Sequence, residues 1–114
     1  YTTQVGRYIK VGRLSFMSFN VTLSTLGTIT GNVQIEGFPF ANETLTGGAQ
    51  RQPLYWASLT TTWVNMLCQM ASAAQVCSVI GAASAATTTA TALVQSDLGA
   101  TTNFGGFMLV RSAN

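Results

Sequence analysis

The chain has 114 residues, of which only 7% are charged and 47% are apolar, and its formal net charge is +2. Average soluble domains carry about 25% charged residues, so small neutral polar residues have replaced most of the usual surface charge. The length suits a single domain over residues 1–114. A net charge this small disfavours a nucleic-acid-binding function.

The first half of the chain has the alternation of half-buried β-strands. Apolar residues recur at every second position from Met17 to Leu23, and again from Ile29 to Ile35. The segment 24–28, which contains Gly27, predicts a hairpin between these two strands. Leu14 and Phe16 fall on the opposite parity, which indicates either a bulge near Phe16 or a sheet with both faces covered. The second option requires a partner surface.

The second half alternates short strand patterns with turns. Pro39 ends the second strand, and residues 41–53 are expected to form a loop. Further strands are expected at 54–63 and 107–111. Residues 65–70 and 75–80 should form a hairpin. The Ala/Thr/Ser run 81–92 favours a loop or an edge strand. The sequence therefore predicts an all-β, antiparallel fold with about seven to eight short strands, sandwich-like or jelly-roll-like.

The predicted hairpin around Ser72 and Ala73 places Cys68 directly opposite Cys77. Opposed positions bring Cβ atoms to about 4.5–5.5 Å, which is close to disulfide geometry but often beyond it. Both cysteines are expected to stay mostly reduced, because this geometry is often beyond that of a disulfide and a reducing compartment disfavours the bond.

Few residues could support catalysis or bind a metal. The sequence contains no His and only three carboxylates, Glu36, Glu43 and Asp97. Glu36 and Glu43 could form the carboxylate pair of a glycan hydrolase, but isolated carboxylates are usually surface charges. Two cysteines without histidine do not complete a structural zinc site. No catalytic residue, metal or cofactor is expected, and no uninterrupted apolar run is long enough to insert into a membrane.

Exposed aromatic and basic side chains are the best candidates for binding. Arg7, Lys10 and Arg13 form either an anion-binding patch or a solvated strand end. Arg51, Tyr55 and Trp56 lie where the long loop meets a strand, and they are the candidate glycan-binding residues. Trp63 is expected to point inward instead. The aromatic residues could equally belong to the core or to a subunit interface.

Several motifs resemble those of the C-terminal domains of bacteriophage tail fibres and tailspikes. The run Gly6-Arg7-Tyr8-Ile9-Lys10-Val11-Gly12-Arg13 is similar to the family's G-x-Y-x-K-x-G-x opening. Thr30-Gly31 followed by Ile35-Glu36-Gly37-Phe38-Pro39-Phe40 resembles its T-G … I-x-G-[LF]-P-F signature. Ser96-Asp97-Leu98 and Gly106-Phe107 resemble its late S-D-L … G-x-Y pattern, with Phe107 in place of the usual Tyr.

The resemblance implies a β-sandwich, a homotrimer and a position at the distal end of an adhesin on the virion, folded in the host cytoplasm. It implies host attachment through a cell-surface polysaccharide or protein, without catalysis, as the C-terminal part of a longer fibre or spike. The same composition suits a capsid-decorating or head-fibre domain, which stays an alternative. The apolar residues on both parities between Leu14 and Leu23 independently favour a self-associating chain.

Overall fold

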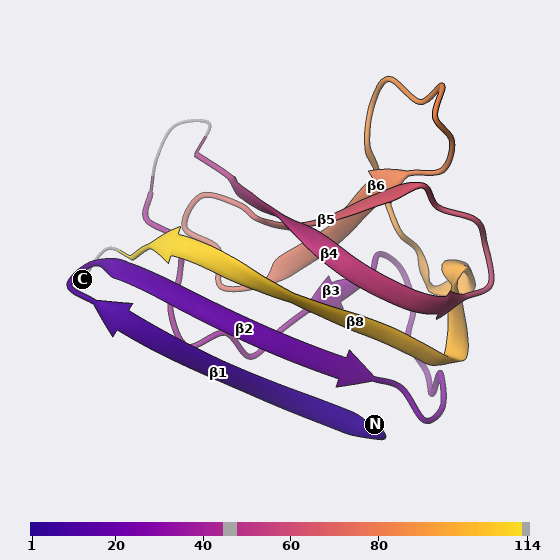
Figure 1. Cartoon of the computed structure of the whole chain (residues 1–114), viewed down its shortest axis with the longest axis horizontal. Coiled ribbons are helices and arrows are strands. Elements are labelled where there is room, and N and C mark those ends of the chain that lie inside the picture. Colours follow the sequence, from indigo (N-terminus) through magenta and orange to yellow (C-terminus); the bar gives the residue numbers. More distant parts are fainter. Residues whose placement is uncertain (45–47, 113–114) are drawn as a thin grey trace.

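The computed structural model describes residues 1–44 and 48–112, and this part of the chain is all-β (Figure 1). Residues 45–47 of the expected 41–53 loop lie outside the described residues. A short 3-10 turn, η1, spans Gln95–Asp97. The strands are β1 (Thr3–Val11), β2 (Leu14–Thr22), β3 (Gln34–Ile35), β4 (Gln50–Leu59), β5 (Asn65–Met70), β6 (Cys77–Ala82), β7 (Thr91–Ala92) and β8 (Leu98–Arg111).

One curled antiparallel sheet contains all eight strands. Its order is β1-β2-β8-β4-β5-β6-β3, and β7 pairs with β6. β4 belongs to two layers, because Gln50–Pro53 pairs with β5 whereas Leu54–Leu59 pairs with β8. The sheet therefore folds over along β4 and gives two facing layers with a core between them (Figure 1). The prediction of an all-β, antiparallel, sandwich-like fold is confirmed.

The predicted hairpin between residues 17–23 and 29–35 is wrong. β2 pairs with β1 on one side and with β8 on the other. The β1–β2 turn is formed by Gly12 and Arg13, and Gly12 adopts φ +58°, as the first position of a type II′ turn requires. After Leu23 the chain crosses to the other layer, where β3 pairs with β6. β1 and β8 pair with the two edges of β2, so no edge of β2 is left for residues 29–35 to pair with.

The predicted hairpin of residues 65–70 with 75–80 is confirmed as β5 and β6, with Ala73 at φ +58° in the turn. Its register differs from the prediction by two residues. Cys68 lies opposite Val79, and Met70 lies opposite Cys77. An even shift keeps every side chain on its predicted face, so both cysteines still point into the core.

The last strand is longer than expected. β8 extends over Leu98–Arg111, and Gly105 and Gly106 lie within it instead of before it. It is the central strand of its layer, between β2 and β4. Gly106 faces inward, where the side chains of Leu54 and Phe19 already occupy the space near its α-carbon.

The core lies between the two layers and contains all four methionines and both cysteines. Its buried members are Met17, Phe19, Leu23, Val33, Phe38, Leu54, Met66, Cys68, Met70, Cys77, Val79, Leu93, Leu98, Phe104, Met108 and Val110. No helix in the described part of the chain is long and apolar enough to cross a membrane.

Candidate functional site

The layer of β1, β2, β8 and β4 presents an outer face that points away from the core. The inward residues of β2, such as Met17 and Phe19, are buried, so the alternate positions of the strand face outward. Residues directly opposite each other share a face. The register therefore places these rows across the outer face: Val11-Leu14-Arg111, Ile9-Phe16-Leu109, Arg7-Ser18-Phe107 and Val5-Asn20-Gly105-Tyr55.

Large apolar side chains occupy the end of the outer face next to the β1–β2 turn. We call this surface the apolar ridge, and it consists of Ile9 (67% exposed), Val11 (72%), Leu14 (52%), Phe16 (42%) and Leu109 (36%). Phe16 stacks on Phe107 with ring centroids 5.3 Å apart. The pairing of β2 with both neighbours is continuous, so no bulge accounts for the parity of Leu14 and Phe16. Leu14 and Phe16 therefore point outward from an unbroken strand, and the bulge option is wrong.

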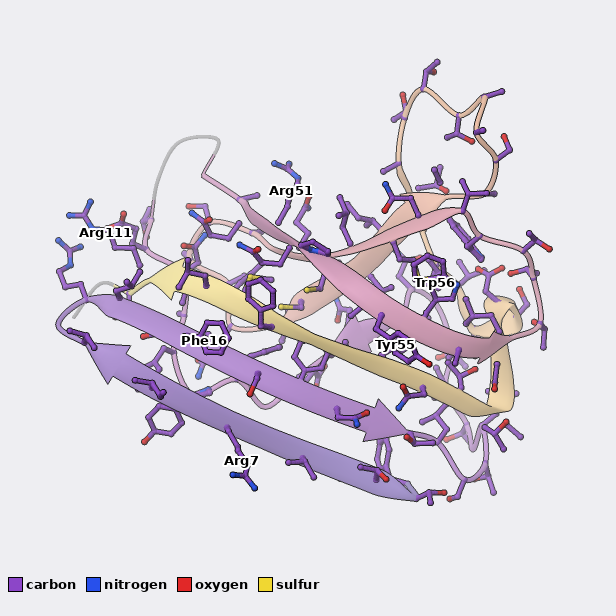
Figure 2. All side chains as sticks on the ribbon, in the orientation of Figure 1. Arg7, Phe16, Arg51, Tyr55, Trp56 and Arg111 are labelled. Atoms are coloured by element: carbon purple, nitrogen blue, oxygen red, sulfur yellow. The ribbon has the colours of Figure 1, made fainter. Side chains whose placement is uncertain are left out.

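The candidate binding residues of β4 are divided between the two faces of the sheet (Figure 2). Tyr55 is opposite Gly105 on the outer face and is 63% exposed. Arg51 also points outward, and its Nε donates a hydrogen bond of 2.6 Å to Oε1 of Gln69 on β5. Four residues of strand separate their α-carbons by about 13 Å.

Trp56 does not join them. It lies opposite Phe104, which is buried, and packs against the core. Trp63 also packs against the core, as expected. Their sequence parities differ, but the register shifts between Ala57 and Leu59, where Ser58 adopts φ +59°. β4 ends at Leu59, so Trp63 lies in the connection to β5, where strand alternation does not set the direction of its indole.

The expected cluster of Arg7, Lys10 and Arg13 is dispersed by the strand geometry. Arg7 is on the outer face, whereas Lys10 points inward and lies 4.5 Å from the ring centroid of Phe40. Arg13 lies in the β1–β2 turn, where its guanidinium binds Glu43. The three residues form no common anion-binding patch.

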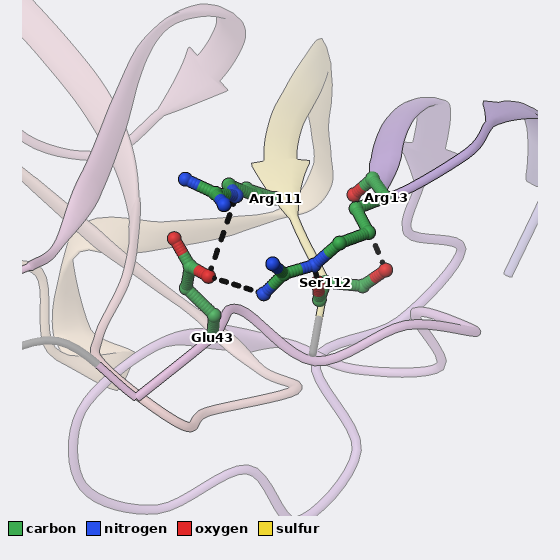
Figure 3. A network of polar contacts seen from close by, with 4 residues as sticks. All are labelled: Arg13, Glu43, Arg111 and Ser112. Carbon is green, nitrogen blue, oxygen red and sulfur yellow. Dashed lines mark hydrogen bonds and ion pairs between the residues drawn. The ribbon is translucent and has the colours of Figure 1, made fainter. Parts of the chain in front are cut away.

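Glu43 is a buried carboxylate held by two arginines (Figure 3). Its Oε2 lies 2.8 Å from Nη2 of Arg13 and 3.5 Å from Nε of Arg111. Arg13 also donates from Nε to the carbonyl of Ser112 at 3.1 Å. The network ties the loop after Phe40 to the ends of β1 and β8. The expectation that Glu43 is a solvated surface charge is therefore wrong. Its carboxylate is buried, and a buried carboxylate requires compensating donors, which the two guanidinium groups provide.

Two connected grooves lie on the inner side of β1, facing residues 33–39. Their volumes are about 320 and 450 Å³. Gln4, Val21, Ile35, Glu36 and Gly37 line both of them, and Glu43 lines neither. The two candidate hydrolase carboxylates are therefore not brought together in either groove.

The two cysteines are free, fully buried thiols on the inner face of the β5–β6 hairpin. A hydrogen bond between them lowers the pKa of Cys68, whereas the same hydrogen bond and burial raise the pKa of Cys77. Sγ of Cys68 also lies 3.5 Å from the carbonyl oxygen of Phe107. Within residues 1–44 and 48–112, no group of three His, Cys, Asp or Glu side chains could hold a metal ion.

The outer face is therefore the candidate functional site, and its chemistry is that of noncovalent contact. Sequence reasoning selected Tyr55, which lies on this face, Arg51, which points outward from the part of β4 that pairs with β5, and Trp56, which packs against the core. It did not identify the apolar ridge as a surface. The available signal was that Leu14 and Phe16 fall on the opposite parity from the core residues of the same strand. Comparisons with protein-family models, with curated proteins and with solved structures gave no match.

Proposed function

We propose that this chain is a non-enzymatic host-attachment domain of a phage tail fibre or tailspike, which trimerises and binds a polysaccharide or protein on the host surface. The observation that carries the proposal is the outer face of the four-stranded layer. It exposes several large apolar and aromatic side chains side by side, and the largest exposed apolar patch of a soluble protein is often a functional contact surface. A surface of this kind serves contact with other molecules.

The motifs that resemble the fibre family pack against one another, which supports the proposal. Tyr8 of the opening motif contacts Phe40 of the second motif edge-to-face, with ring centroids 5.2 Å apart. Phe38 of the second motif contacts Phe19 in the core in the same way at 5.7 Å. Asp97 of the late motif accepts hydrogen bonds from Thr61 and from the backbone of Val94. These motif residues stabilise one scaffold and leave the outer face for binding.

The proposed receptor-binding residues are Tyr55 and Arg51. An exposed phenol ring offers an apolar face to a sugar ring, and a guanidinium offers forked donors to hydroxyl or carboxylate groups. Their separation of about 13 Å suits contacts with different residues of an extended glycan better than with one sugar. Trp56 is excluded from the proposed site because it packs against the core.

Replacement of Tyr55 by Ala tests this function. We expect Tyr55→Ala to weaken adsorption of the fluorescently labelled domain to the phage's bacterial host by at least about tenfold, as loss of an exposed aromatic anchor does at interfaces. Tyr1→Ala is the matched control, since Tyr1 is 67% exposed but lies beside a groove on the other side of the sheet. Equal adsorption of all three proteins would contradict binding at Tyr55.

A further inference from the structure

We propose that the open edge of β1 binds an extended polypeptide segment as an added antiparallel strand, whose alternate side chains enter the two connected grooves. The site lies on the inner side of the sheet, and neither Tyr55 nor Arg51 lines the grooves. The proposal is therefore separate from the proposed attachment function, and neither depends on the other. In this mode of binding, the main chain supplies affinity and the pockets for alternate side chains supply specificity.

The backbone of β1 offers a row of hydrogen-bonding groups to an incoming strand. β1 is an end strand, and in the described part of the chain its only paired neighbour is β2 (Figure 1). Val11 and Leu14 flank the tight turn and form its hydrogen-bonded pair, so every second residue back from Val11 directs its N–H and C=O towards β2. The intervening residues Gln4, Gly6 and Tyr8 direct theirs away from the sheet. A second extended backbone is the ligand that matches this row.

β1 lacks two features that usually prevent pairing at a sheet edge. Its register with β2 is continuous over the whole strand, so no bulge turns the edge away. The strand is 9 residues long and contains no proline. Gln4, Gly6 and Tyr8 are all exposed, although these positions are on the core side of the sheet. The stretch from Gln4 to Tyr8 is therefore accessible to another strand.

The grooves provide space for the side chains of the added strand. Residues opposite Gln4, Gly6 and Tyr8 would share their face and point into the grooves, whose volumes are about 320 and 450 Å³. Gly6 leaves room, because a β-carbon there would have its nearest neighbour 3.9 Å away. A large apolar side chain opposite this edge glycine would fill the room and contact Ile35 and Phe38, which line the same groove.

Glu36 determines the charge that the occupant should carry. Its side chain is exposed, lines both grooves and forms no ion pair with any residue that the structure describes. Gln4 also lines both grooves, so a Lys or Arg side chain opposite Gln4 would lie beside this carboxylate. The expected occupant is an extended segment with a large apolar residue and a basic residue two positions apart.

A second copy of β1 suits this site less well than such a segment does. Two β1 edges paired about Gly6 would place glycine opposite glycine, and the room beside Gly6 would stay empty. Main-chain pairing alone would then hold the two edges together, without the side-chain contacts that give an added strand its specificity.

Fluorescence anisotropy with a designed probe tests the proposal on the whole chain. The probe is the fluorescein-labelled peptide Thr-Val-Thr-Phe-Thr-Lys-Thr, whose Val, Phe and Lys amides would face β1 opposite Tyr8, Gly6 and Gln4. We expect saturable binding below about 1 mM. N-methylation of the Phe amide should weaken binding at least about tenfold, because it removes a donor to β1. N-methylation of the preceding Thr amide, which points away from β1, is the matched control and should change binding by less than about twofold.

A substitution in the groove locates the probe on the protein. Glu36→Gln should weaken binding of this probe by about two- to fivefold, as loss of an exposed ion pair does, and should leave binding of a probe with norleucine in place of Lys unchanged. An equal effect on both probes would overturn the role of Glu36. Equal affinities of the two methylated probes would overturn pairing with β1. Absence of binding up to about 1 mM would overturn the site, including the case in which a second copy covers the edge. Each of these results leaves the attachment function to be judged by the adsorption of Tyr55→Ala.

Discussion

Glu43 is the residue whose environment departs most from what its sequence context indicates. It is preceded by Asn42, which is also buried and whose Nδ2 donates to the carbonyls of Gly48, Met70 and Ala71. The two side chains together hold the 41–44 segment against the ends of β5 and β8. A loop that carries buried polar groups with partners is a structural element and not a solvated linker.

Loss of the Glu43 carboxylate should destabilise the fold. We expect Glu43→Gln to lower the free energy of unfolding by about 1–3 kcal/mol, because hydrogen bonds to charged groups contribute about this much and two arginines lose their counter-ion. Urea denaturation measures the change. Glu36→Gln is the control, since Glu36 is exposed and its replacement should shift stability by less than about 0.5 kcal/mol. Equal effects of the two substitutions would contradict the buried ion-pair network.

The buried thiols should resist alkylation. Thiolates are the reactive form, and the raised pKa of Cys77 keeps that thiol protonated at pH 8. The pKa of Cys68 is lowered, but its sulfur has no exposure to solvent. We expect iodoacetamide to modify neither residue of the native protein within an hour at pH 8, and to modify both in guanidinium chloride, as read by mass spectrometry. Rapid native modification of either cysteine would mean that the β5–β6 hairpin opens readily.

At the scale of elements, the β5–β6 hairpin depends on a close approach at Gly81. A β-carbon there would overlap the carbonyl oxygen of Asn65 and lie 3.1 Å from the ring of Trp63. We expect Gly81→Ala to destabilise the protein by about 1–3 kcal/mol, the usual range for overpacking.

Gly6→Ala is the matched control in another strand, β1. A β-carbon added at Gly6 would have its nearest neighbour, the carbonyl oxygen of Ser18, 3.9 Å away, so the substitution should be neutral or stabilise by about 0.5 kcal/mol. Thermal unfolding followed by circular dichroism measures both. A Gly81→Ala variant as stable as Gly6→Ala would refute the tight packing of β5 on β6.

Local patterns predicted some elements well and others poorly, for a physical reason. The β5–β6 hairpin is found from sequence because its strands are neighbours and its turn is short. The pairing of β2 with β8 joins residues 14–22 to residues 103–111, and nothing local in either segment specifies the other. The alternation from Met17 to Leu23 identified the inward face of β2 but not its neighbours.

The candidate site was predictable in part for the same reason. Alternation places Arg51 and Tyr55 on one side of β4, but the strand begins at Gln50, so both lie within it and not at the predicted loop–strand boundary. β4 has a bulge at Ser58 and ends at Leu59, so the direction of Trp63 cannot be obtained by counting strand parity from Trp56. Ser58 with φ +59° is held by β8, since the hydroxyl of Thr102 donates to its carbonyl at 2.9 Å.

At the scale of the whole molecule, the chain has few charges and a sheet whose two faces are both apolar near the β1–β2 turn. One face forms the core of the domain. The other is available for contact between copies, and its β4 side carries the exposed Tyr55. These properties together favour an assembled attachment domain over an isolated globular protein.

The mass of the wild-type chain in solution is the most direct test of the proposed assembly. One chain has a mass of 12.0 kDa, so a trimer has three times 12.0, or 36 kDa. We expect multi-angle light scattering during size-exclusion chromatography at micromolar concentration to give 36 kDa. A mass of 12.0 kDa under these conditions would contradict the proposed trimer.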